Sequence, residues 1–147
     1  MFRKKISEQG FTLIELMVVI VILGVLAALI APRIMGRPEE ARRVKARLQI
    51  EAIENALKFY KLDNGSYPST EQGLEALIEL PSVGKLPKSW KKGGYFEKGK
   101  VPNDPWDNDY VYLSPGNHDE YDLMSYGPDG EQGGEDEDKD INSWETD

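Results

Sequence analysis

The sequence predicts an α+β fold in which a long N-terminal helix packs against a small antiparallel β-sheet. Three observations predict this fold. An apolar run extends from residue 11 to residue 31, a second stretch with helical spacing of apolar residues follows from 39 to 63, and two β-rich segments joined by a turn lie near the C-terminus. A chain of 147 residues has room for one membrane helix and one small domain.

The apolar run predicts a helix that crosses a membrane. It is about 21 residues long, and at a rise of about 1.5 Å per residue such a helix covers a bilayer core of roughly 30 Å. Its only charged residue is Glu15. Ionisable groups inside a membrane are costly and usually functional, and a plain signal-anchor helix, which is the alternative, leaves Glu15 unexplained.

A short basic leader precedes the apolar run and ends at Gly10. In an ordinary signal peptide the small residue at the cleavage site follows the apolar core. Here Gly10 comes before the apolar residues, and Phe11 begins them. Cleavage after Gly10 would therefore remove the basic residues and keep the helix.

The second helical stretch has apolar residues three and four positions apart, which predicts an amphipathic helix packed on its own domain. Asp63-Asn64-Gly65 supplies its C-cap. The predicted apolar stripe consists of Val44, Leu48, Ala52, Ile53, Ala56, Leu57 and Tyr60. Opposite charges four residues apart are expected to pair on the exposed side: Glu39 with Arg43, Arg47 with Glu51, and Glu54 with Lys58.

The rest of the chain predicts a long loop followed by strands. Within the loop, one short helical piece is expected at 70–80, because Ser69 and Gln72 have the spacing of a capping box. Residues 109–113 and 120–126 have the composition of strands, and the turn residues between them predict an antiparallel hairpin within a small sheet.

The composition excludes several classes of function. The net charge is −8 and the acidic excess lies near the C-terminus, so nucleic acid is not an expected partner, since phosphate binding needs a basic footprint. The chain has no cysteine to form a stabilising disulfide. His118, the only histidine, has no nucleophile arrangement to serve, and we expect a structural protein and not an enzyme.

Residues 126–141 hold closely spaced carboxylates among glycines. Ca²⁺ takes oxygen ligands from such mixtures, whereas zinc and copper favour sulfur or clustered histidine. A disordered acidic tail is the alternative, and composition alone favours it. However, Ile141 and Trp144 follow the acidic run and predict that the chain returns to pack on the domain.

The N-terminal motif, Gly-Phe-Thr-Leu-Ile-Glu at 10–15, closely resembles the class III signal of type IV pilins and pseudopilins. The resemblance implies that prepilin peptidase cleaves between Gly10 and Phe11 and that the new amine of Phe11 is methylated. It also implies that Glu15 pairs with the Phe11 amine of a neighbouring copy. Such a head-to-tail contact does not close, so it builds a helical filament.

A narrower resemblance covers almost the whole chain. The segments 62–74, 104–106, 114–118 and 127–144 look like the major pseudopilins of type II secretion systems. In that family the C-terminal loop binds a calcium ion. The matching positions imply side-chain ligands from Asp129, Asp140 and Asp138 and the carbonyl of Tyr126. The loop is denser in acid than is usual for the family, which leaves the choice among Glu135, Asp136, Glu137 and Asp138 open.

The resemblance also departs at two positions and implies a domain organisation. Asp107 and Asp109 replace a usual Gly and a common Pro of the family. We expect a cleaved leader at 1–10, a transmembrane and assembly helix at 11–35 and a periplasmic domain at 36–147. That domain comprises a stalk helix at 39–63, a variable loop at 64–104, and the sheet and calcium loop at 105–147.

The location and role follow from the same resemblance. It implies a single-pass protein of the bacterial inner membrane with its C-terminal domain in the periplasm; basic residues flank both ends of the apolar run, so charge alone does not orient it. The expected role is the major subunit of a filament that pushes folded proteins through the outer membrane. Expected partners are other copies, minor pseudopilins, prepilin peptidase and an inner-membrane assembly platform. The alternatives are a type IV pilin for adhesion or DNA uptake, and a membrane-anchored calcium-binding module that does not polymerise.

Overall fold

The computed structural model describes residues 12–96 and 99–145, without the side chains of residues 29–37. In chain order the elements are the helix α1 (Leu13–Asn64), the 3₁₀ turn η1 (Leu74–Leu77), the strands β1 (Val111–Leu113) and β2 (Asp122–Ser125), the 3₁₀ turn η2 (Asp136–Asp138) and the strand β3 (Ile141–Asn142). The chain divides into two compact units, Met1–Pro38 and Glu39–Asp147. Each unit is described by itself.

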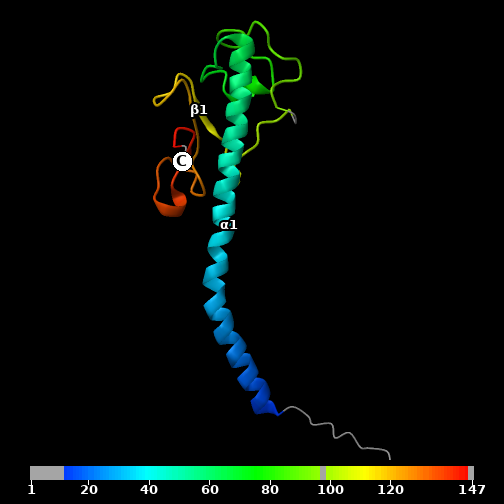
Figure 1. The fold of residues 1–147 in the computed structure, drawn as a ribbon, viewed down its shortest axis with the longest axis vertical. Helices are drawn as coiled ribbons and strands as arrows, with labels where there is room; N and C mark the ends of the chain where they lie inside the picture. Colours follow the sequence, from blue (N-terminus) through cyan, green and yellow to red (C-terminus); the bar gives the residue numbers. More distant parts are fainter. Residues whose placement is uncertain (1–11, 97–98, 146–147) are drawn as a thin grey trace, which may run out of the picture. The chain divides into compact units, whose positions relative to one another are not determined.

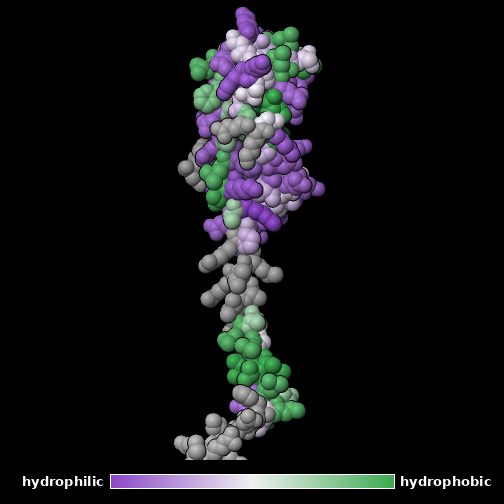
Figure 2. Space-filling model, turned by 90° about the vertical axis from the view of Figure 1, so that its right-hand side faces the viewer, coloured by the Kyte–Doolittle hydropathy of each residue, from purple (hydrophilic) through white to green (hydrophobic). Residues whose placement is uncertain are grey.

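In the first unit, α1 begins after Thr12, which caps it. The Thr12 side-chain oxygen accepts a hydrogen bond from the backbone N–H of Glu15 at 3.3 Å. The large apolar side chains between Leu13 and Leu26 are 46–77% exposed, and Figure 2 shows them as a continuous hydrophobic band. Of the predicted span 11–35, Phe11 and the side chains from residue 29 lie outside the described residues.

Within the part of the chain that the structure describes, no helix combines the length and the apolarity needed to cross a membrane.

In the second unit, the part of α1 after Pro38 buries one side against the domain. The residues on that side are at most 4% exposed: Ala46, Ile50, Ile53, Ala56, Leu57 and Tyr60. The predicted stripe is wrong at Val44, Leu48 and Ala52, which are exposed. Each step of four residues advances about 40° beyond a full turn, so a 44–48–52 series drifts around the helix, whereas alternating steps of four and three stay on one side.

The predicted ion pairs along this helix are wrong as well. Among the described residues, Glu39 pairs with Arg42 at 3.4 Å and not with Arg43. Glu54 accepts the hydroxyl of Tyr121 at 2.8 Å in place of the ammonium group of Lys58. The expected pairing of Arg47 with Glu51 does not form. At Glu54 a long-range contact replaces the local pair that the spacing favoured, whereas Glu39 takes a local partner at a different spacing.

The sheet has three antiparallel strands in the order β1-β2-β3. Val111 lies opposite Met124 between β1 and β2, and Ser125 lies opposite Ile141 between β2 and β3. In Figure 1 the sheet and the C-terminal loops, coloured yellow to red, lie beside the part of α1 that follows Pro38. The predicted α+β fold and its hairpin are confirmed, and β3 is a strand that the sequence did not predict.

Tyrosines fill much of the space between this helix and the sheet. Tyr60, Tyr110, Tyr112 and Tyr121 are each at most 8% exposed. The hydroxyls of Tyr110, Tyr112 and Tyr121 find acceptors; for example, Tyr112 donates to the carbonyl of Pro68 at 2.8 Å. Burial raises the pKa of Tyr112 to about 12. The domain therefore uses aromatic rings with satisfied polar ends to build a core that contains few large aliphatic residues.

The long loop after α1 is tied down by the predicted capping box. The Ser69 N–H donates to the side-chain oxygen of Gln72 at 3.0 Å, and the Gln72 N–H donates to the Ser69 hydroxyl at 3.3 Å. The Gln72 amide also donates to the carbonyls of Val83 and Lys85, at 2.8 and 3.0 Å. The helical piece expected at 70–80 shortens to the 3₁₀ turn η1. Gly65, with a φ of 81°, ends α1 as predicted.

Candidate functional site

The residues of the predicted assembly motif fall on both sides of the described boundary. Gly10 and Phe11 lie outside the described residues. Glu15 lies exposed in the first turn of α1, and its side chain has no hydrogen bond or ion pair with another described residue. A carboxylate in a first turn is favoured by the unpaired N–H groups and the positive end of the helix dipole. Glu15 is thus available for an external cationic partner.

The residues of the predicted metal loop lie between β2 and β3, which are joined through a turn at 127–130 and the 3₁₀ turn η2. Tyr126 follows the last residue of β2 and is half-buried. Asp129 lies exposed in the next turn, where one carboxylate oxygen accepts the N–H of Glu131 at 3.2 Å. Asp138 ends η2 and is exposed, and Asp140, immediately before β3, is half-buried. The acidic segment is therefore an ordered loop, and the chain returns to the domain through Ile141, which is 4% exposed.

Asp140 is the residue of this set with an unusual environment. Its Oδ2 accepts the N–H of Gly133 at 2.9 Å, which closes the loop at 133–140 around η2. Its Oδ1 is buried and has no hydrogen-bond partner among the described residues. Leaving a buried carboxylate oxygen unpaired is costly, so this atom fits a cation as its partner.

Glycines let the backbone close tightly around Asp138. A Cβ on Gly134 would clash with the carbonyl oxygen of Asp138, and the Gly134 φ of 90° disfavours any other residue. An ideal Cβ on Gly127 would lie 3.6 Å from the same oxygen. The carbonyl of Asp138 therefore faces the inside of the loop.

Carboxylates alone do not make a metal site here. Among the described residues, no three acidic, histidine or cysteine side chains come close enough together to hold a metal ion. A cation in this loop would need main-chain carbonyls as well as Asp140, and Ca²⁺ accepts such mixed oxygen ligands with irregular geometry.

The start of the loop is anchored by a buried carboxylate that sequence reasoning did not single out. Asp104 is 4% exposed. Its Oδ1 accepts the N–H groups of Trp106 and Asn108 at 3.0 and 2.8 Å, and its Oδ2 accepts the Ser125 hydroxyl at 2.6 Å. The Ser125 oxygen in turn accepts the N–H of Gly127 at 3.2 Å. The short spacing from Asp104 to Trp106 and Asn108 is typical of an Asx turn and could have indicated this role.

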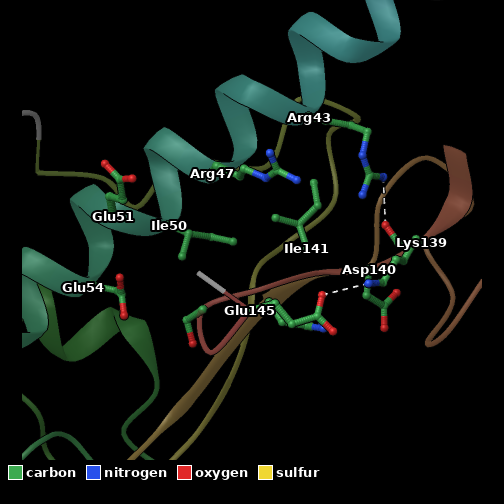
Figure 3. Close-up of a pocket in the computed structure, with 11 residues that line it drawn as sticks. Arg43, Arg47, Ile50, Glu51, Glu54, Lys139, Asp140, Ile141 and Glu145 are labelled. Carbon is green, nitrogen blue, oxygen red and sulfur yellow. Dashed lines mark hydrogen bonds and ion pairs between the residues drawn. The ribbon is translucent and has the colours of Figure 1, made fainter. Parts of the chain in front are cut away.

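A second missed residue is Arg43, which contacts the far end of the loop. Its Nη1 donates to the carbonyls of Glu137 and Lys139 at 3.1 and 2.8 Å. Arg43 lines a cavity of about 180 Å³ between α1 and β3, and Figure 3 shows it extending with Arg47 from α1 over the segment of Lys139 and Ile141. No sequence signal could have found this contact, because its partners lie 94 and 96 residues away.

The hairpin turn beside the loop has its own buried carboxylate. Asp122 accepts the N–H groups of Asn117 and His118 and the His118 ring nitrogen at 2.9, 3.1 and 3.0 Å. Burial by itself raises the pKa of Asp122, but the hydrogen bonds outweigh it, so the pKa lies below its ordinary value. His118 has a structural role as well, because its ring stacks on the ring of Trp144 with the two ring centroids 4.0 Å apart.

Comparison with known protein families supports a role in secretion. The family described as type II secretion system (T2SS), protein G matches residues 33–144. The family described as the prokaryotic N-terminal methylation motif matches residues 6–31, which include Gly10, Phe11 and Glu15.

Individual proteins agree with these matches. The chain is 54% identical over 140 residues to the type II secretion system core protein G of Pseudomonas aeruginosa, covering 95% of this chain and 97% of that protein. It is 54% identical over 138 residues to the protein of the same name from Escherichia coli strain K12, covering 94% and 92%. The crystal structure of the major pseudopilin from the type 2 secretion system of enterohaemorrhagic Escherichia coli matches with a TM-score of 0.67 and 41% identity, over 77% of this chain and 95% of that one.

Proposed function

The chain belongs to the protein G family of the type II secretion system and is a major pseudopilin, and from this premise we propose how it assembles and what stabilises it. Copies join head-to-tail into a helical filament in the periplasm. Extension of the filament pushes folded proteins through the outer membrane. Its role is structural and not catalytic. Membership of this family favours secretion over the type IV pilin and the non-polymerising calcium module.

The N-terminal motif supplies the assembly contact. Prepilin peptidase cleaves after Gly10, and the amine of Phe11 is methylated and keeps its positive charge. Glu15 of one copy then pairs with the Phe11 amine of the next. The observation that supports this step is the exposed Glu15 carboxylate without a partner among the described residues, at the start of an apolar helix whose side chains are also uncovered.

The methylation motif and the relatives indicate a membrane-anchored periplasmic protein. We propose that the anchor is a single pass of residues 11–35 through the inner membrane. The lipid covers the exposed apolar side chains until the subunit joins the filament. The partners besides other copies are prepilin peptidase, the inner-membrane assembly platform and minor pseudopilins.

The C-terminal loop holds a calcium ion in this proposal. Asp140 is the main side-chain ligand because its Oδ1 is buried without a described partner. The inward-facing carbonyl of Asp138 and the carbonyl of Tyr126 add main-chain oxygens. For Asp129 and the side chain of Asp138 to join them, the loop must close further around the ion, because no three acidic side chains lie together among the described residues. A bound calcium ion supplies positive charge that neutralises part of the acidic loop. No catalytic step involves it.

Processing is the most direct test of the assembly proposal. Gly10→Leu should leave the leader attached, because a large side chain replaces the small residue at the cleavage position. Mass spectrometry of the parent from membranes should give a chain that starts at Phe11 with one added methyl group. Gly24→Leu is the control, because a Cβ at Gly24 meets nothing within 4 Å and lies away from the cleavage position. Finding Met1 retained in assembled filaments of the parent would refute the proposal.

A further inference from the structure

Three arginines follow one another closely on α1, and they differ in what they contact. Arg42 pairs with Glu39 on the same helix. Arg47 makes no hydrogen bond or ion pair with any other described residue. Arg43 alone of these three reaches the acidic loop, where one nitrogen, Nη1, donates to two backbone carbonyls, those of Glu137 and Lys139. The guanidinium therefore recognises the path of the backbone and not a carboxylate.

Along the chain, the carbonyls of Glu137 and Lys139, which Arg43 binds, alternate with oxygen groups of Asp138 and Asp140 that face the loop interior. The carbonyl of Asp138 lies between them in sequence and faces Gly134 and Gly127. The Asp140 carboxylate, one residue beyond Lys139, bonds to Gly133 across the loop and keeps its Oδ1 buried. By fixing the carbonyls of Glu137 and Lys139 toward α1, Arg43 sets the direction of the intervening Asp138 carbonyl and of Asp140.

We propose that Arg43 is a positioning residue for calcium, which holds the 137–140 segment so that its oxygens face the metal. The inference rests on the calcium part of the proposed function. Arg43 does not contact the ion in this view, because a guanidinium is a cation that has no acceptor to offer a metal. Residues that orient metal ligands in this way commonly change metal affinity by roughly 10–100-fold when they are replaced.

The charge of Arg43 makes this proposal easy to distinguish from an electrostatic role. A cation beside a Ca²⁺ site repels the ion, so loss of a positive charge alone should tighten calcium binding. Loss of a positioning contact should weaken binding despite that gain. Arg47 is a matched control, since it lies one turn further along the same helix, lines the same cavity and lacks the contact with the loop.

The experiment measures Ca²⁺ binding to the full chain in detergent by titration calorimetry. Compared with the parent, Arg43→Ala should weaken binding by roughly tenfold or more, and Arg47→Ala should leave it unchanged or slightly tighter. Arg43→Lys should restore much of the affinity, because a single ammonium nitrogen can donate to both carbonyls. Hydrogen exchange of the backbone N–H groups at 137–140, measured without calcium, should be faster in Arg43→Ala alone.

The outcomes separate the two proposals. If the parent binds no Ca²⁺ and Asp140→Ala behaves like it, the calcium proposal fails and the role of Arg43 fails with it. If the parent binds Ca²⁺ and Arg43→Ala binds as tightly as Arg47→Ala, only the positioning role is refuted. Circular dichroism of each variant shows whether the domain is folded, and the Lys variant keeps the test decisive if the Ala variant is not.

Discussion

The two parts of α1 differ in where their apolar side chains find partners. Between Leu13 and Leu26 the large apolar side chains are at least 46% exposed, whereas Ile53 and Leu57 after Pro38 are fully buried against their own domain. The first part must be covered from outside its unit, and the second part is covered from within. In one continuous helix, the side chains of the first segment can therefore serve assembly, while those of the second segment stabilise the folded domain. Substitutions should separate the two.

The largest effect is expected from Glu15→Leu. The variant should enter membranes as well as the parent, because a charge in lipid is costly. It should form few or no filaments, because the Phe11 amine loses its partner, and thermal unfolding of the domain should not change. Filament counts by electron microscopy give the main readout, with Glu15→Asp as the charge-retaining control. Normal filament yield from the Leu variant would show that the pair does not drive assembly.

Leu57→Ala should lower the stability of the domain, which Glu15→Leu should leave unchanged. It creates a cavity beneath the sheet, so the free energy of unfolding should fall by about 2–5 kcal/mol. Leu62→Ala on the same helix should change it by less than about 0.5 kcal/mol, because Leu62 is 79% exposed. Chemical denaturation of the full chain in detergent measures both. Equal losses from the two variants would mean that burial does not distinguish these positions.

Asp122→Asn tests the turn between β1 and β2, whose backbone N–H groups the buried Asp122 carboxylate accepts. At neutral pH the amide would face N–H donors, and the loss of unfolding free energy should be about 1–3 kcal/mol. The folded pKa of Asp122 lies below its unfolded value, so its contribution is present above about pH 3.9 and is lost as the pH falls through the folded pKa.

The corresponding measurement is denaturation from neutral to acidic pH. The parent should have a higher free energy of unfolding than Asp122→Asn at neutral pH, and this difference should vanish in acid. The exposed Asp119→Asn control should have the same free energy of unfolding as the parent at every pH. A constant difference between parent and Asp122→Asn at every pH would contradict the assigned hydrogen-bonded carboxylate.

The smallest effect concerns calcium. Sites of the extracellular type have dissociation constants of roughly 10⁻⁴–10⁻³ M, so millimolar Ca²⁺ should stabilise the domain by about 0.4–1.4 kcal/mol. Asp140→Ala should remove the response to calcium and to EDTA in thermal melts, and Glu131→Ala, an exposed acid of the same loop, should keep it. If parent and Asp140→Ala melt together in both buffers, the loop is not a calcium site.

Local signals in the sequence predicted most of the fold, and long-range contacts account for what they missed. The capping box at Ser69 and Gln72 and the helix end at Gly65 involve residues within a few positions of each other, so spacing alone predicts them. Arg43 has a possible local partner in Glu39, and only the folded domain shows that it bonds to the loop instead.

The strand β3 has two residues, too few for a pattern, and forms because β2 offers it a free edge. For the candidate site, the composition indicated the acidic loop and the family resemblance implied Asp140 as a ligand, which stays a prediction. The sequence could not indicate the buried, partnerless Oδ1 that makes Asp140 distinctive, because that burial depends on how the loop closes.

The contact of Arg43 with Glu137 and Lys139 joins residues that are 94 and 96 positions apart, and this has a consequence for biosynthesis. During synthesis Arg43 leaves the ribosome long before residue 139 does. The stalk therefore waits without this contact until residue 139 has been made and exported, and contacts between such distant residues form slowly. A chain that is truncated or stalled before β3 stays open along the stalk and offers that segment to proteases. Synthesis of the segment from Glu137 through β3 thereby becomes the step that protects the domain from degradation.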